Sequence, residues 1–130
     1  MSALNGEPVF RAITNKNWRD KKTQAIKRNA FLFKGSRQEE GLSVYMGLVD
    51  SCMLALEAVK TDFRESYGAG HMNREDIPTA GGAGLHLRVE QDAPNHGQIL
   101  GLPDYEDPQN EKLAEDIANA LLEICTDCGQ

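Results

Sequence analysis

The chain has 130 residues, of which 40% are hydrophobic and 26% are charged, and its formal net charge is −6. This length suits one hydrophobic core, and no apolar run approaches the ~20 residues that a membrane-spanning helix needs. We therefore expect residues 1–130 to form a single domain that does not enter a membrane. Because no secretory leader pattern opens the sequence, we also expect a cytoplasmic location.

Residues 9–13 predict the first strand, because apolar and other side chains alternate there after a proline. The alternation places Arg11 on the apolar face of this strand. An inward-pointing arginine needs a partner, and its guanidinium suits a carboxylate or phosphate of a ligand. The alternatives are an edge arginine that reaches solvent, or a structural pair with an acid such as Glu90. The polar, basic stretch 15–27 predicts a short helix or a loop.

Two more strands and a long helix are expected next. Residues 31–33 and 42–45 are predicted strands, and the polar face of the second strand carries Ser43. Apolar residues then recur at spacings of three and four, which predicts an amphipathic helix over residues 49–64. Its expected buried face comprises Leu48, Val49, Cys52, Met53, Leu56, Val59 and Phe63.

The second half of the chain predicts a loop, two strands and a final helix. Glycines make residues 67–84 a loop-rich centre, with a short helix over 74–77. Alternation predicts a strand over 85–90 and a shorter one over 98–100. Asp107, followed by a proline, is a typical N-cap for the final helix. This order predicts an α+β fold, with a mixed or antiparallel sheet of about five short strands and two covering helices.

His96 and Gln98 lie in the segment 92–103, D-A-P-N-H-G-Q-I-L-G-L-P, which contains two turn signals. A histidine in such a loop can act as a general base, a proton shuttle or a ligand, because its pKa lies near neutrality. The alternative is a solvated turn histidine without a role. We expect His96 to lie near Arg11 and Ser43, which sit on neighbouring predicted strands.

The three cysteines, Cys52, Cys125 and Cys128, are too few and odd in number for a secreted disulfide scaffold. We therefore expect three free thiols, with Cys52 buried in the first long helix. The C-x-x-C spacing of the last two suits a metal knuckle, but no matching pair supplies the other ligands. We expect neither a metal site nor a bound cofactor.

Charge is divided unevenly along the chain. Residues 1–37 carry nine Lys and Arg and two acidic residues, a net charge of +7. Residues 38–130 carry five Lys and Arg and eighteen acidic residues, a net charge of −13. The basic residues around Trp18 are typical of a nucleic-acid-binding arm over residues 16–37. The alternative, which we favour, is that the basic part packs against the acidic remainder of the same domain.

Three segments together resemble a family of small, uncharacterised bacterial proteins. They are V-F-R-A-I-x4-W near the start, A-F-L-F…E-E-G-L-S-V after it, and H-G-Q-I-L-G-L-P late in the chain. The order of an arginine strand, a serine strand and a late amide is also similar to the ADP-ribosyltransferase layout. That resemblance implies that Arg11 and Ser43 hold NAD, and that Gln98 stands where the family has a glutamate that orients the ribose.

The leading hypothesis is a small cytoplasmic accessory protein that binds a protein partner. It follows from the small size, the lack of a recognised catalytic set and the bipolar charge. One alternative is an NAD-using, ADP-ribosyltransferase-like enzyme with Arg11, Ser43, His96 and Gln98 as its site residues. The other is a nucleic-acid-binding protein that uses residues 16–37.

Overall fold

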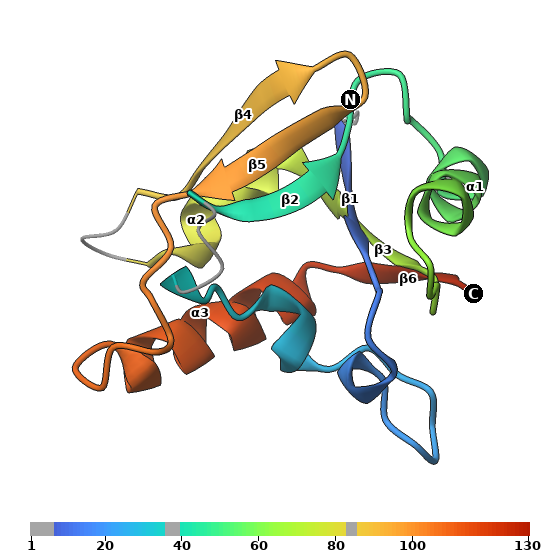
Figure 1. Ribbon diagram of the computed structural model, residues 1–130. Coiled ribbons are helices and arrows are strands. Elements are labelled where there is room, and N and C mark those ends of the chain that lie inside the picture. The colour runs from blue at the N-terminus through green and yellow to red at the C-terminus, as the bar shows by residue number, and fades with distance from the viewer. Residues whose placement is uncertain (1–6, 36–39, 83–85) are drawn as a thin grey trace.

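The computed structural model describes residues 7–35, 40–82 and 86–130. Within these ranges six strands form one antiparallel sheet in the order β4-β5-β2-β1-β3-β6 (Figure 1). The same ranges contain three α-helices and three 3₁₀ helices. The fold is therefore α+β, with one more strand and one more α-helix than the sequence predicts.

The strands are β1 Pro8–Ala12, β2 Leu42–Tyr45, β3 Ala69–Asn73, β4 Arg88–Ala93, β5 His96–Leu100 and β6 Thr126–Gly129. The α-helices are α1 Cys52–Asp62, α2 Ile77–Ala80 and α3 Glu111–Glu123. The 3₁₀ helices are η1 Lys16–Trp18, η2 Arg28–Phe31 and η4 Arg74–Asp76. In the part of the chain described here, no helix has the length and apolar character needed to cross a bilayer.

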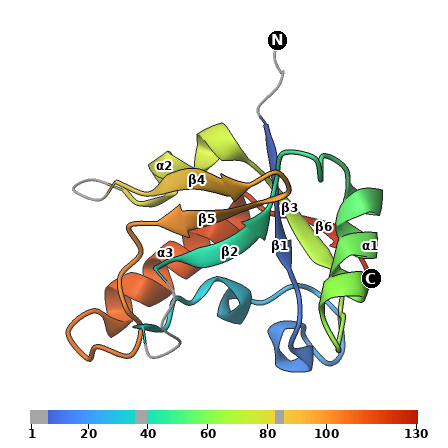
Figure 2. The same cartoon turned by 45° about the horizontal axis from the view of Figure 1, so that its top comes forward.

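The two faces of the sheet pack against different helices. Side chains alternate between the faces of a strand, so Val9 and Val44 join one core, which also contains residues of η2 and α3. Phe10 and Tyr45 join the other core, which lies against α1. Figure 2 shows α1 and α3 on opposite sides of the sheet.

The sheet is divided between β1 and β2. These strands pair at one position, Phe10 opposite Tyr45, although β1 pairs with β3 over five residues and β2 pairs with β5 over four. Beyond that position β1 and β2 point in different directions (Figure 1). A strand that leaves its neighbour loses ladder partners, so other groups must satisfy the backbone there.

The structure differs from the expected elements at three places. Residues 31–33 form no strand, because η2 turns Ala30 and Phe31 into the core beside α3. The segment predicted as a loop contains β3, and its Gly70 permits close packing, since a Cβ there would collide with the Cys125 sulfur. The C-terminal residues form β6, which pairs with β3.

Element boundaries also need correction. The strand expected over 98–100 starts at His96, so this histidine lies in β5 and not in a loop. The helix α1 starts at Cys52, and the Ser51 hydroxyl caps it by accepting a hydrogen bond from its first turn. Some residues of its predicted buried face, such as Met53, are exposed. Asp107 does not cap α3, which begins four residues later, because its carboxylate closes a tight turn onto the Gln109 amide. The expected strand over 85–90 starts at Arg88 instead, and residue 85 lies outside the described residues.

Candidate functional site

A pocket of about 250 Å³ opens where β1 and β2 separate. Arg11, Ser43 and His96 all line it, so the three residues lie near one another, as predicted from the sequence. Tyr45 and Asp62 add a phenol and a carboxylate to its wall. The remaining lining residues are mostly apolar: Ala12, Thr14, Trp18, Val44 and Phe63.

Arg11 bridges the gap between the separated strands. Its side chain is 8% exposed, its Nε donates to the Ala30 carbonyl at 2.7 Å, and its Nη1 donates to the Ser43 carbonyl at 2.9 Å. The guanidinium carbon also lies 5.2 Å from the centroid of the Trp18 ring, within cation–π range. Glu90, the acid suggested as an alternative structural partner, instead forms a salt bridge with Arg88 of its own strand.

His96 is held by a carboxylate from the preceding strand. Its Nδ1 lies 2.6 Å from Asp92 Oδ1, and Gln98 Nε2 donates to Asp92 Oδ2 at 3.1 Å. Both contacts lower the pKa of the Asp92 carboxyl, the contact with His96 more strongly. Gln98 is not among the residues that line the pocket; it supports the carboxylate behind His96 instead.

Tyr45 lies directly opposite His96 in the β2–β5 register. Its hydroxyl donates to Asp62 Oδ2 at 2.7 Å, which links β2 to the end of α1. Burial, and then this hydrogen bond, raise the pKa of the Tyr45 hydroxyl above its ordinary value. Neither Tyr45 nor Asp62 was predicted as a site residue from the sequence. Alternation along the strand only places Tyr45 on the same face as Ser43.

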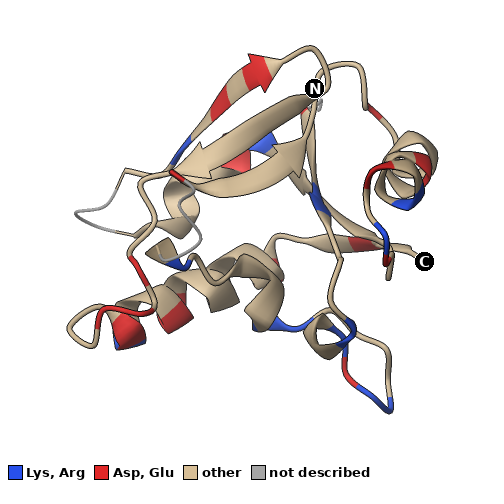
Figure 3. Cartoon of the chain, viewed as in Figure 1, with Lys and Arg blue, Asp and Glu red and all other residues tan. Residues whose placement is uncertain are grey.

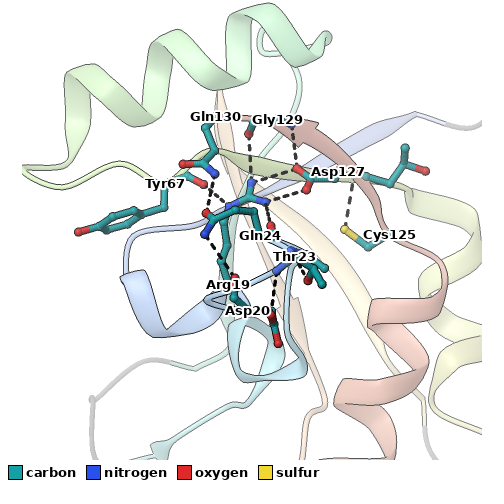
Figure 4. Close-up of polar contacts among 11 residues, drawn as sticks. Arg19, Asp20, Thr23, Gln24, Tyr67, Cys125, Asp127, Gly129 and Gln130 are labelled. Atoms are coloured by element: carbon teal, nitrogen blue, oxygen red, sulfur yellow. Dashed lines mark hydrogen bonds and ion pairs between the residues drawn. The ribbon is translucent and has the colours of Figure 1, made fainter.

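A second polar cluster surrounds Arg19, whose side chain is 4% exposed. Its guanidinium donates to both oxygens of Asp127, at 2.7 and 3.0 Å, and to the carbonyls of Tyr67, Gln24 and Gly129 (Figure 4). The bond from Arg19 is also the main cause of the lowered pKa of the Asp127 carboxyl. These contacts connect the basic segment, residues 16–37, to β6. The cluster therefore holds two distant parts of the chain together.

The basic segment and the acidic remainder of the chain are in contact. Besides the Arg19–Asp127 pair, Arg28 forms a salt bridge of 3.0 Å with Glu115 of α3. Figure 3 shows further basic residues along the loop around η1. The exposed ones are Lys16, Lys21, Lys22 and Lys27.

Cys52 and Cys128 form a disulfide between the start of α1 and β6. The expectation of three free thiols is therefore wrong, because pairing with β3 brings β6, and with it Cys128, beside the helix. Cys52 is also only partly buried, and not buried as expected. Cys125 remains free, and burial raises the pKa of its thiol to about 12. Within residues 7–35, 40–82 and 86–130, no cluster of three His, Cys, Asp or Glu residues could hold a metal ion.

The chain was compared with family models, with curated proteins and with solved structures, and it matches none of them. The resemblances noted in the sequence therefore stay predictions.

Proposed function

We propose that the pocket between β1 and β2 binds a small organic ligand of the nucleoside type, and that the protein uses NAD in the manner of ADP-ribosyltransferases. One observation supports this most: Arg11, Ser43 and His96 come from distant parts of the sequence and line the same pocket. Ligand sites are typically concave and largely apolar, with a few converging polar groups.

The pocket wall suits a planar ring joined to a ribose. Trp18 and Phe63 provide aromatic side chains on which a ring can stack. Ser43 and Asp62 provide hydrogen-bonding partners for ribose hydroxyls. Since the volume of about 250 Å³ is small for a whole dinucleotide, we expect the nicotinamide riboside half to enter and the adenosine half to lie outside.

Two features depart from the layout that the resemblance implies. Gln98 contacts Asp92 and does not line the pocket, so His96 is the ionisable group that β5 supplies to the site. Arg11 already donates to two backbone carbonyls, so its main contribution is to hold the shape of the pocket.

Trp18 makes this proposal directly testable, because it is the single tryptophan of the chain and lines the pocket. We expect NAD to change its fluorescence saturably. The substitution Phe63→Ala removes a stacking surface and should weaken binding about tenfold. Leu113→Ala is the matched control, since the two side chains are 41% and 40% exposed and Leu113 belongs to α3. A titration without saturation, or equal effects of both substitutions, would contradict NAD binding at this site.

A protein partner is the second candidate. In the described residues, four of the five large hydrophobic side chains that are exposed lie on α1 or next to it. These are Leu48, Met53, Leu54 and Phe63, with exposed fractions of 72%, 69%, 40% and 41%. Apolar side chains gathered on one exposed element are typical of interaction surfaces.

The partner hypothesis is tested by replacing apolar side chains outside the pocket. We expect the double variant Leu48→Ser, Met53→Ser to fold normally but to fail to capture the proteins that the wild-type chain captures from its native lysate. Leu113→Ser serves as the control and should keep them. Capture of the same proteins by all three chains would remove the case for this surface.

A further inference from the structure

We propose that His96 is the proton-accepting residue of the pocket, that Asp92 and Gln98 are its positioning residues, and that the acceptor substrate carries a hydroxyl group. The inference rests on the proposed use of NAD and specifies the chemistry of that same site. It is carried by the geometry of the β4–β5 hairpin.

Asp92 occupies a β-bulge next to the pocket. The register of β4 against β5 shifts between Gln91 and Ala93, so Asp92 is an extra residue in its strand. A bulge changes the direction in which the extra side chain points, and bulges often occur beside functional sites. Here the bulge lets one carboxyl group contact both His96 and Gln98.

The contact with Asp92 determines which nitrogen of His96 is left for a ligand. With Nδ1 at 2.6 Å from the carboxylate, the neutral ring carries its proton on Nδ1 and leaves Nε2 as an acceptor. Gln98 donates to the second carboxylate oxygen at 3.1 Å and thereby holds the carboxylate in place. This is the arrangement expected of a general base.

The other ionisable groups of the pocket already have partners. Tyr45, on β2 opposite His96, donates to Asp62 at the end of α1. Arg11 on β1 donates to the Ala30 and Ser43 carbonyls. Among the described residues that line the pocket, His96 therefore offers an ionisable nitrogen that is not engaged by the protein.

With NAD as the donor, the proposed reaction is a substitution at the anomeric carbon of the nicotinamide ribose. The oxygen of the acceptor hydroxyl bonds to the anomeric carbon of the nicotinamide ribose while its proton passes to Nε2 of His96. The glycosidic C–N bond breaks, and its electron pair goes to the ring nitrogen, so that neutral nicotinamide leaves. The imidazolium then releases its proton to solvent. With water as the acceptor, the products are ADP-ribose, nicotinamide and a proton.

The experiment measures the release of nicotinamide from NAD across a range of pH, using the full chain and three variants. We expect His96→Gln to lower the rate constant about a hundredfold or more. We expect Asp92→Asn to lower it about tenfold and to change the pH profile. Glu90→Gln is the matched control and should behave as wild type, because it removes a carboxylate of β4 that pairs with Arg88.

Binding is measured separately, so that the two proposals can fail separately. Affinity for NAD, read from Trp18 fluorescence, should change no more than about twofold in His96→Gln and Asp92→Asn. Saturable binding with no nicotinamide release, or with release that neither substitution slows, overturns the role of His96 and leaves NAD binding standing. Failure of the wild-type chain to bind NAD overturns both proposals.

A second readout does not depend on turnover. Nitrogen NMR of the histidine rings should show neutral His96 protonated at Nδ1 in the wild-type chain and in Glu90→Gln. The loss of the carboxylate in Asp92→Asn should shift the ring toward the other tautomer. A wild-type ring that carries its proton on Nε2 overturns the inference.

Discussion

Arg11 shows how one side chain can replace part of a missing strand ladder. The separation of β1 from β2 leaves the carbonyl of Ser43 without a ladder partner from β1, and the buried guanidinium donates to this oxygen and to the Ala30 carbonyl. A charged donor to a buried carbonyl stabilises more than a neutral one. The same side chain therefore links β1 to β2 where they separate and lines the pocket there.

Replacing Arg11 should consequently cost stability. The substitution Arg11→Met keeps most of the length of the side chain but removes every donor, so we expect the free energy of unfolding to fall by about 2–4 kcal/mol. Urea denaturation measures this loss. Arg88→Met is the control, because that arginine is 61% exposed. Equal stability of the two variants would show that the Arg11 hydrogen bonds contribute little.

Tyr45 should make the protein sensitive to alkali. Burial raises its pKa above the ordinary value of 10.0, so the folded chain holds the phenolic proton more tightly than the unfolded chain does. This contribution to stability is complete below the unfolded pKa and is lost as the pH rises through the folded pKa.

We therefore expect the free energy of unfolding to decline above about pH 10, and the decline to be shallower in Tyr45→Phe. Urea unfolding at several alkaline pH values measures the slope. Tyr105→Phe, a tyrosine outside the pocket wall, is the comparison. If Tyr45→Phe leaves the slope of the free energy of unfolding against pH unchanged, another group causes the loss of stability in alkali.

At the scale of elements, the Cys52–Cys128 disulfide joins the first turn of α1 to β6. Its cysteines are 76 residues apart, so the bond restricts a long stretch of the unfolded chain. We expect reduction, or the double substitution Cys52→Ala, Cys128→Ala, to lower the free energy of unfolding by about 2–4 kcal/mol. Urea unfolding with and without reductant measures the change.

Thiol titration supplies the control for the disulfide. Denatured, unreduced protein should expose one thiol, that of Cys125, and Cys125→Ala should expose none and keep its response to reductant. Three thiols without reductant would contradict the bond. Stable disulfides are more typical of oxidising compartments, so the cytoplasmic location expected from the sequence stays a prediction.

At the scale of the whole molecule, the uneven charge is partly neutralised by folding. Arg19 and Arg28 of the basic segment already pair with Asp127 and Glu115. The net charge of −6 also repels a polyanion at long range. The distribution therefore favours weak binding of nucleic acid, even though exposed lysines remain.

Salt titration of binding to mixed RNA and DNA oligonucleotides tests this expectation. We expect weak binding even at low salt, and little further loss in the variant with Lys21, Lys22, Lys27 and Arg28 changed to alanine. Arg28→Ala alone controls for the broken salt bridge. Micromolar binding at ~0.15 M salt that the quadruple variant loses would make residues 16–37 a nucleic-acid surface.

Local periodicity in the amino-acid sequence was sufficient to predict several elements of the fold. Alternation located β1 and β2 and placed Arg11 and Ser43 on their faces, because successive side chains of a strand point in opposite directions. Spacings of three and four located the two long helices. These signals were enough to predict the α+β class.

Features that depend on contacts between segments far apart in the chain could not be predicted from local patterns. The strands β3 and β6 carry glycines and polar residues that are typical of loops, and they are strands because their neighbours supply a ladder. The disulfide, the Tyr45–Asp62 pair and the contacts of Arg11 with backbone carbonyls arise in the same way. Local patterns report which way a side chain points, whereas packing between distant segments decides what that side chain meets.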